Sequence, residues 1–378
     1  MQKVWLDRLA RTDWILLGSV FTLTAIGLLM IYGIGASYET VSLIQFRKQI
    51  IALIIGFAGL ITLSIIDFRQ IKILGTVIYV FGLLMLTSVL IFGVTIRGTR
   101  GWFEIGSITI QPVEIAKIIF AIFLASYFAR HIHKRLNWIT FFGSTFAMLA
   151  YVGLILLQPD FGSAMVIVVM WAVAIAFAGL RPRAWFFLIS IATLSAILLW
   201  SFGLQPYQKD RITSFLNPQA DPLGAGYNVI QAQTAIGSGG WFGKGVGEGS
   251  QSRLRFLPEA STDFMFAVMG EELGFVGIAL VLTLFGTLLV RVIWIGYKSK
   301  DVFAAVYCVA IVGMFGMHVL VNAGMNMGVM PVTGIPLPFA SAAASSLVAG
   351  FFAIGLVQSI VVHASHEDQF SFLPPKVH

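Results

Sequence analysis

The chain alternates between long apolar runs and short polar segments. A membrane-spanning helix needs about 20 mostly apolar residues, and runs of approximately this length predict about ten spans. Their ranges are 14–35, 50–66, 72–94, 112–129, 138–157, 161–180, 184–203, 264–290, 302–323 and 340–363. The irregular segments 95–111 and 324–339 are expected at the membrane interface or as re-entrant stretches. The pattern therefore predicts an all-α integral membrane protein, folded as a single polytopic domain over residues 1–378.

Composition supports this class, because 58% of the 378 residues are hydrophobic and only 11% are charged. A soluble domain carries roughly a quarter charged residues, so lipid must replace water around much of this surface. The single cysteine, Cys308, excludes an intramolecular disulfide and a cysteine-based metal cluster. The first apolar run is too long for the hydrophobic part of a signal peptide and no cleavage site follows it, so no cleavable signal is expected.

The formal net charge of +7 comes from short clusters of Lys and Arg between apolar runs. Such clusters are the usual topology signal and do not favour nucleic-acid binding. Ten spans place both termini on one side. With that side in the cytoplasm, the inner segments carry more Lys and Arg than the outer ones. We therefore expect a multi-pass protein of the cytoplasmic (inner) membrane with both termini in the cytoplasm.

One long loop, residues 204–263, is expected outside the cytoplasm between the seventh and eighth spans. Two polar, proline-containing stretches flank its glycine-rich run AIGSGGWFGKGVGEGSQ, and a loop of this length is usually functional. The glycine-rich run lacks the spacing of a phosphate-binding P-loop, so alone it is a weak signal. Arg211, Lys244 and Arg253 add positive charge, which suits an anionic substrate or the headgroups of lipids.

Asp263 ends this loop and stands directly before the eighth predicted span. A carboxylate at the boundary between water and lipid can act as a general base for a substrate whose headgroup lies there. Alternatively, Ser261, Thr262 and Asp263 resemble a helix N-cap, whose side chain accepts hydrogen bonds from free backbone N–H groups. The two roles are compatible, because Ser261 or Thr262 could cap the helix and leave Asp263 for substrate.

Other ionisable residues fall inside predicted spans, where such residues are rare and usually face a cavity or a partner. Glu271 and Glu272 lie about 12 Å beyond Asp263 along a helix. They could form a structural ion pair, stay protonated or line a polar cavity. Glu114 and Lys117 share a helix face. They could pair with one another, or Lys117 could meet a phosphate or an acid on another helix.

The segment 322–339 is apolar but interrupted by glycine and proline, and it carries Asn322 and Asn326 one turn apart. Broken backbone at membrane depth is tolerated where it lines a cavity or packs within protein. Such a segment suits a transporter, and it equally suits an enzyme with a groove open to lipid. The histidines show no metal-binding spacing, so no metal-ligating residues are predicted.

Two regions of the chain resemble signatures of the SEDS family (shape, elongation, division and sporulation). They are DPLGAGYNVIQAQTAIGSGGWFGKGVGEGSQ, followed by FLPEASTDFMFAVMGEELG, and GVMPVTGIPLPFASAAASS. The resemblance covers roughly residues 12–363. The motif TGIPLPF and the short terminal segments are more similar to the RodA elongation branch than to the FtsW division branch. The resemblance implies a peptidoglycan glycosyltransferase that polymerises lipid II at the outer face of the membrane. It also implies a class B penicillin-binding protein as partner transpeptidase, within an elongation complex of membrane proteins.

By motif position, the resemblance implies that Asp263 is the essential acid. It also implies that Glu114 and Lys117 lie in a central polar cavity. The candidate substrate-binding residues are Glu114, Lys117, Lys244, Arg211, Arg253 and Ser341. The partner contact is expected in the long loop and in the eighth and ninth spans. The chain departs from the family where SAAASS at 341–346 replaces Ser-Tyr-Gly-Gly-Ser-Ser, and where Ser261 stands in a position often held by His.

The expected reaction is a single inverting displacement, in which a sugar hydroxyl attacks the anomeric carbon of a donor linked to polyprenyl pyrophosphate. Asp263 would accept the hydroxyl proton. Arg or Lys side chains, or a divalent cation such as Mg²⁺ or Mn²⁺, would face the leaving pyrophosphate. The alternatives are a division polymerase of the FtsW type, a flippase for the lipid-linked precursor, which needs a polar path across the membrane, and a non-catalytic scaffold, which would not need the Asp263 carboxylate.

Overall fold

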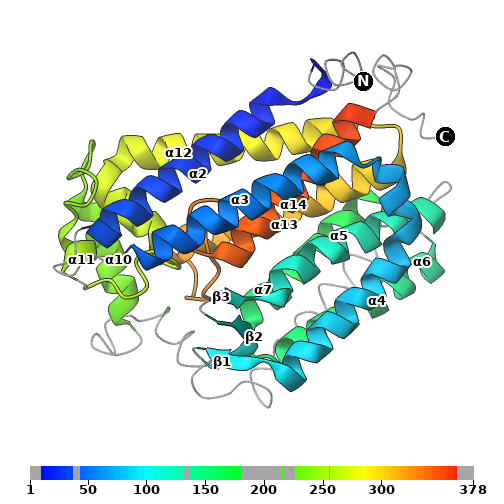
Figure 1. Ribbon diagram of the computed structural model, residues 1–378, viewed down its shortest axis with the longest axis horizontal. Coiled ribbons are helices and arrows are strands. Elements are labelled where there is room, and N and C mark those ends of the chain that lie inside the picture. The colour runs from blue at the N-terminus through cyan, green and yellow to red at the C-terminus, as the bar shows by residue number, and fades with distance from the viewer. Residues whose placement is uncertain are drawn as a thin grey trace.

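The computed structural model describes residues 10–36, 43–96, 98–106, 108–131, 137–179, 226–254 and 256–363, with Phe215 as a single further residue. Long helices dominate this part of the chain and pack side by side as one bundle (Figure 1). They are α2 (Trp14–Ala36), α3 (Ile44–Ile65), α4 (Phe68–Phe92), α5 (Pro112–His131), α6 (Trp138–Leu156), α7 (Phe161–Phe177), α12 (Met265–Lys298), α13 (Val302–Asn326) and α14 (Ala344–His363).

The expected multi-pass, all-α fold is confirmed. Within the described ranges, eight helices are long and apolar enough to cross a membrane, and α7 is a shorter apolar helix. The seventh predicted span, 184–203, lies outside the described residues. Helix α3 begins at Ile44 rather than at residue 50, because its first turns carry polar residues that a hydropathy pattern excludes.

Helix starts follow ordinary capping chemistry. The side chains of Asp67, Asn137, Asp160 and Asp301 each accept a backbone N–H bond in the first turn of α4, α6, α7 and α13. Such caps satisfy N–H groups that have no partner within the helix. Polar residues in the short connections therefore fix where these apolar helices begin.

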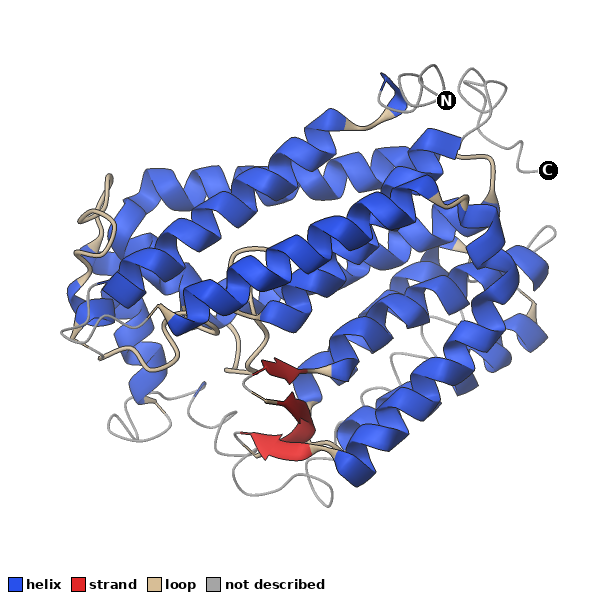
Figure 2. Cartoon of the chain, in the orientation of Figure 1, coloured by secondary structure: helices blue, strands red, loops and turns tan. Residues whose placement is uncertain are grey.

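Residues 94–110 form a small antiparallel sheet, where the sequence analysis expected an irregular stretch. The strands β1 (Val94–Ile96), β2 (Thr99–Ile105) and β3 (Ile108–Ile110) lie in the order β1-β2-β3. In the register, Val94 is paired with Trp102 and Phe103 with Ile110. Figure 2 shows the strands at one end of the bundle, in red. The long loop contributes two short helices, α10 (Tyr227–Ser238) and α11 (Ser250–Arg253).

Burial separates central helices from peripheral ones. In the most apolar stretch of α5, 83% of the residues are buried, against 22% in α4. Helices α13 and α14 are also mostly buried, whereas α3 and α12 expose apolar side chains. Small residues allow close helix contacts, as at Gly56 of α3, where an added Cβ would lie 3.1 Å from the Cβ of Phe351 of α14. The peripheral helices therefore present their apolar faces to lipid.

The bundle has two chemically distinct ends. The loop end comprises the sheet, α10, α11 and the segments 256–264 and 327–343. The terminal end comprises the start of α2, the end of α14 and the connections α3–α4 and α12–α13, and Figure 1 shows these together. The candidate catalytic residues gather at the loop end.

Candidate active site

Asp263 lies at the loop end, in the turn that precedes α12. Its backbone carbonyl oxygen accepts hydrogen bonds from the side-chain amides of Asn322 (3.0 Å) and Asn326 (3.1 Å), both near the end of α13. Both asparagines are fully buried, whereas Asp263 is half-buried. The N-cap residue of α12 is Phe264, not Asp263. The end of α13 therefore fixes the main chain of the turn that carries the candidate acid.

Ser341 holds the same turn from the other side. Its hydroxyl donates to the carbonyl oxygen of Thr262 (2.6 Å) and accepts from the backbone N–H of Leu337 (2.9 Å). The N–H of Ala342 donates to the carbonyl oxygen of Ser261 over 2.7 Å. Ser341 is buried. In this structure the hydroxyl of Ser341, a candidate substrate-binding residue, therefore contacts the backbone and stabilises the Asp263 turn.

Helix α3 supports this arrangement through two glutamines that the sequence analysis did not single out. The Ser261 hydroxyl donates to the side-chain oxygen of Gln45 over 2.6 Å. The side-chain amide of Gln49 donates to the carbonyl oxygen of Ser341 over 2.9 Å, and Gln49 is buried. Two polar side chains one turn apart in the first half of an apolar helix were the available signal. Helices α3 and α13 therefore converge on one turn.

Gly334 lies beside the Asp263 carboxylate. A Cβ at Gly334 would be 3.6 Å from Oδ2 of Asp263, and Gly334 has a φ of 73°, a backbone conformation that favours glycine. The neighbouring Thr333 Oγ1, and Oδ1 of Asn322, are buried and have no hydrogen-bond partner among the described residues. Buried polar atoms are normally bonded to protein or water. The surroundings of Asp263 therefore suit polar groups from solvent or substrate.

A buried charge network lies on the inner side of this turn. Lys117 Nζ lies 2.8 Å from Glu114 Oε1 and 3.0 Å from Nε2 of His318 on α13. An ammonium group can only donate, so the imidazole nitrogen that faces it accepts. His318 precedes Asn322 by one turn on the same face of α13, about 6 Å along the axis. Of the alternatives for Glu114 and Lys117, the structure shows the mutual ion pair.

Glu271 and Glu272 bind the glycine-rich run to α12. Glu271 Oε1 lies 2.8 Å from Lys244 Nζ, and the same carboxylate accepts the N–H of Gln251 over 3.0 Å. Glu272 Oε2 accepts the N–H of Gly247 over 2.9 Å. Both glutamates are buried. The structural alternative therefore accounts for these two carboxylates, which hold residues 244–251 against the start of α12.

Close backbone contact makes this attachment possible. Gly274 interrupts α12 with a φ of 68°, and a Cβ there would come within 2.3 Å of the backbone nitrogen of Gly243. The N–H groups of Phe275 and Val276 then donate to the carbonyl oxygens of residues 240 and 241. The glycine-rich run is therefore a built part of the helix surface.

The three cationic candidates of the loop have separate positions. The side chain of Lys244 is 31% exposed and is paired with Glu271. Arg253 is exposed and lies 3.5 Å from Glu248. Arg211 lies outside the described residues. Lys244 and Arg253 are therefore each paired with a glutamate, Glu271 and Glu248 respectively.

Comparison with known proteins places this geometry in a family. A family model described as "Cell cycle protein", of the FtsW/RodA/SpoVE type, matches residues 13–366. The chain is 35% identical to the peptidoglycan glycosyltransferase MrdB of Escherichia coli K12, over 76% of this chain and 77% of that protein. It is 32% identical to the peptidoglycan glycosyltransferase RodA of Treponema pallidum, over 92% of this chain and 97% of that protein.

Solved structures agree with the sequence relatives. A chain from a structure described as the structural coordination of polymerization and crosslinking by a peptidoglycan synthase complex superposes with a TM-score of 0.79 and 31% identity. The alignment covers 93% of this chain and 97% of that one. The rod shape determining protein RodA of Thermus thermophilus gives a TM-score of 0.70 and 27% identity, over 95% of this chain and 98% of that protein.

Proposed function

Because the chain belongs to the SEDS family of cell cycle proteins (FtsW/RodA/SpoVE), we propose that Asp263 is the general base of its glycosyl transfer. The protein is a peptidoglycan glycosyltransferase, and a role in cell elongation fits the relatives MrdB and RodA. The observation that supports the Asp263 assignment is its position. It is a half-buried carboxylate at the loop end, on a turn held by Asn322, Asn326 and Ser341.

The proposed substrate is lipid II, presented from the leaflet at the loop end. The C4 hydroxyl of the acceptor sugar attacks the anomeric carbon of the donor, and the bond to the polyprenyl pyrophosphate breaks. Asp263 takes the hydroxyl proton as the new glycosidic bond forms. One carboxylate on the side opposite the leaving group gives inversion at the anomeric carbon. Gly334 suits this role, since a larger residue would occupy space next to Oδ2.

The leaving pyrophosphate needs positive charge on its side of the donor. The candidates are Lys244, Arg253 and Arg211, because all three belong to the loop 204–263, which ends at Asp263. The side chain of Lys244 stays partly exposed even when it is paired with Glu271. Among the described residues, no three His, Cys, Asp or Glu side chains lie close enough together to hold a metal ion. We assign no step of the reaction to a divalent cation.

We propose supporting roles for Glu114, Lys117 and Ser341, which lie on the protein side of the substrate site. Ser341 holds the Asp263 turn through its backbone bonds. The Glu114–Lys117 pair is buried, and Lys117 contacts His318, which precedes Asn322 by one turn of α13. A buried charge pair with fixed geometry supplies a preorganised dipole close to the reacting groups. A substrate oxygen could reach Lys117 only by displacing one of its present partners.

We place the loop end outside the cytoplasmic membrane and both termini in the cytoplasm. The partner proposed for crosslinking is a class B penicillin-binding protein, with other membrane proteins of the elongation complex around it. We expect the penicillin-binding protein to dock on the exposed side of α12, where Leu280, Val290 and Ile293 face outward. Trp241 and Phe242 continue this apolar surface at the loop end, and Trp241 contacts Phe275 of α12.

A flippase would need a polar path between the two ends. In α5, the residues that follow the Glu114–Lys117 pair toward the terminal end are buried Phe120, Phe123 and Phe128. The facing part of α13 includes Tyr307 and Ile311, also buried. Among the described residues, most of the buried ionisable side chains therefore lie in the half of the bundle nearer the loop end, as a polymerase acting at one face requires.

The direct test is polymerisation of lipid II by the purified full-length protein, with and without a class B partner. We expect glycan strands whose length is read from gels, and greater activity with the partner. In parallel, vesicles that contain fluorescent lipid II would report transbilayer movement. Movement of the lipid without glycan formation would favour the flippase and contradict the proposal.

A further inference from the structure

A cavity remote from Asp263 opens at the terminal end between α2, α3 and α14. Its volume is about 600 Å³, which is within the range of small-molecule sites. The wall is formed mainly by apolar side chains, among them Leu17, Phe21, Leu53, Phe57, Ile61 and Val362. No step of the glycosyl transfer uses these residues, so the cavity needs its own explanation.

The same helices reach both sites from opposite ends. On α3, Gln45 contacts Ser261 of the Asp263 turn and Gln49 contacts Ser341, which holds that turn. Phe57 and Ile61 of the same helix line the cavity. Twelve residues separate Gln49 from Ile61, which corresponds to about 18 Å along a helix. The cavity therefore belongs to the half of the membrane farther from the catalytic turn.

Polar groups occur at one end of the cavity. Thr12, Ser64 and Gln358 are its polar wall residues. Gln358 makes two hydrogen bonds with the backbone of Asp13, at 3.1 Å and 3.0 Å. The buried carboxylate of Asp13 accepts the guanidinium of Arg291 over 2.6 Å. The cavity thus has an apolar interior and a charged, hydrogen-bonded rim.

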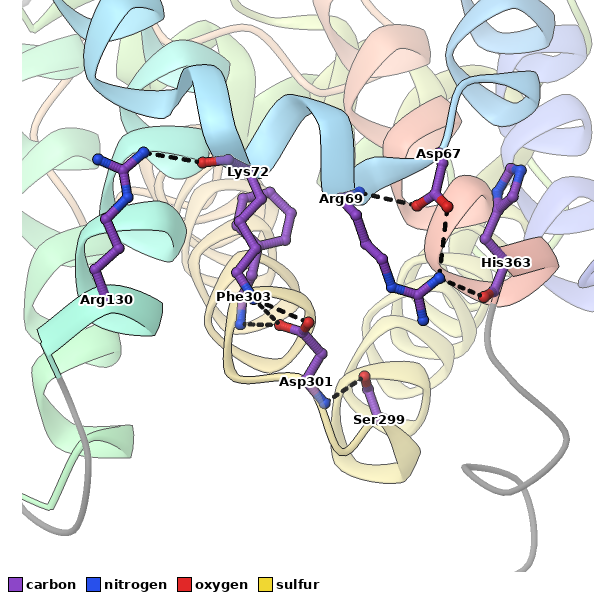
Figure 3. A network of polar contacts seen from close by, with 8 residues as sticks. All are labelled: Asp67, Arg69, Lys72, Arg130, Ser299, Asp301, Phe303 and His363. Carbon is purple, nitrogen blue, oxygen red and sulfur yellow. Dashed lines mark hydrogen bonds and ion pairs between the residues drawn. The ribbon is translucent and has the colours of Figure 1, made fainter.

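Arg69 lies next to this rim. Its Nη1 is 3.4 Å from the carbonyl oxygen of His363, which follows the wall residue Val362, and 3.4 Å from Asp67 (Figure 3). The Arg69 side chain is 48% exposed. The Arg69 side chain is therefore partly accessible beside the opening, despite its pairing with Asp67.

The described residues of the terminal end carry an excess of positive charge. Its described residues include seven basic side chains, of Arg11, Arg69, Lys72, Arg130, Arg291, Lys298 and Lys300. They include three acidic side chains, of Asp13, Asp67 and Asp301. Basic clusters at a membrane surface attract anionic lipids. Trp14, which is 60% exposed at the rim, suits the interface between headgroups and acyl chains.

We propose that this cavity binds one acyl chain of an anionic phospholipid from the leaflet at the terminal end, with the lipid phosphate at Arg69. A cavity in a hydrocarbon surrounding gains dispersion contacts when a chain fills it. The hydrophobic effect does not distinguish lipid from protein inside a membrane, so shape and headgroup charge give the selectivity. An arginine fork binds phosphate, and the ammonium group of a zwitterionic headgroup offsets the negative charge that the guanidinium attracts.

The polyprenyl chain of the donor substrate is the competing occupant. Its pyrophosphate has to lie near Asp263, at the other end of α3, so a chain seated here would enter from the wrong leaflet. A phospholipid of the near leaflet needs no such path. The site is therefore a structural lipid site, independent of the reaction.

Photo-crosslinking tests the proposal in the full-length protein, reconstituted with phosphatidylglycerol that carries a photoreactive acyl chain. We expect the label in peptides that contain residues 53–65 and 358–362. Ile61→Trp fills the cavity and should abolish this label. Ile55→Trp is the matched control, because Ile55 lies on the same helix, is 51% exposed and does not line the cavity. This control should label like the wild type.

Headgroup selectivity is tested by competition with unlabelled lipids. Phosphatidylglycerol should displace the label better than phosphatidylcholine, and Arg69→Gln should remove this difference. Arg130→Gln, at the same end but on α5, should keep it. Labelling that is spread over all lipid-facing helices and unchanged by Ile61→Trp would overturn the proposal. Stronger displacement by a polyprenyl phosphate than by phosphatidylglycerol would also overturn it.

Discussion

The side-chain amide of Asn322 lies 3.0 Å from the backbone carbonyl oxygen of Asp263, and the same amide lies 2.8 Å from the carbonyl oxygen of Ile335. One buried side chain therefore connects the turn of the proposed base to the segment that carries Gly334. The position of the Asp263 carboxylate depends on this connection. Displacement of a catalytic group by even 1 Å can lower a rate about 100-fold.

Asn322→Leu removes both hydrogen bonds at nearly constant size. We expect kcat for lipid II polymerisation to fall about 10- to 100-fold with little change in KM, because the base is displaced while substrate contacts remain. Thr283→Val, which alters an exposed hydroxyl on α12, is the control and should keep full activity. An Asn322→Leu enzyme with wild-type kcat would show that this amide does not position the base.

Gly334→Ala tests the space beside the carboxylate. The φ of 73° at Gly334 makes alanine cost about 1–2 kcal/mol, and the new methyl group would lie next to Asp263 Oδ2. Gly98→Ala has the same backbone cost, with a φ of 80°, but nothing lies within 4 Å of its Cβ position. Both variants should lose similar thermal stability, and only Gly334→Ala should lose polymerase activity. Equal activity of the two would contradict the proposed approach of substrate past Gly334.

Lys244→Met tests the attachment of the glycine-rich run. Glu271 is fully buried, and a buried carboxylate that loses its cation destabilises a protein by roughly 3–5 kcal/mol. We expect somewhat less here, because Lys244 is partly exposed and other donors to Glu271 remain. Thermal unfolding in detergent measures this. Arg253→Gln breaks an exposed pair and should change the stability by less than about 1 kcal/mol.

The double variant Lys244→Met/Glu271→Leu should recover part of the stability, because no unpaired charge is left. Additive losses of the two single variants would show that the pair is not coupled.

His318→Leu tests the network beneath the turn. The substitution removes the acceptor at 3.0 Å from the buried Lys117 ammonium, and an unsatisfied buried group costs about 1–3 kcal/mol. His318→Gln supplies an amide oxygen in its place and should retain most of the stability and activity. If the leucine and glutamine variants behave alike, Lys117 does not depend on this acceptor.

The sequence predicted the architecture because hydrophobic length alone identifies helices that must span lipid. It could not predict the sheet at 94–110, since β1 and β3 have only three residues each. The seven residues of β2, TRGWFEI, show no clear alternation between apolar and polar positions. The start of α3 was missed for a related reason: its polar first turns, with Gln45 and Gln49, serve the active site and so lower the hydropathy there.

The candidate site was predicted in part. Asp263 stood out because a carboxylate precedes an apolar run, but its supports at Asn322 and Ser341 come from residues 59 and 78 positions away. Spacing in one chain does not show such pairs. His318 was not among the candidate site residues, although an ionisable residue within a span is itself a signal for a buried partner. Arg211 stays a prediction, because it lies outside the described residues.

The rate of glycan polymerisation from lipid II by Asp263→Asn protein tests the central claim most directly. Asparagine keeps the size and the backbone contacts of this position but cannot accept the proton at a useful rate. A general base contributes about 10²- to 10⁴-fold, so we predict a loss of that order with normal folding and partner binding. Polymerisation at the wild-type rate would contradict the assignment of Asp263 as the base.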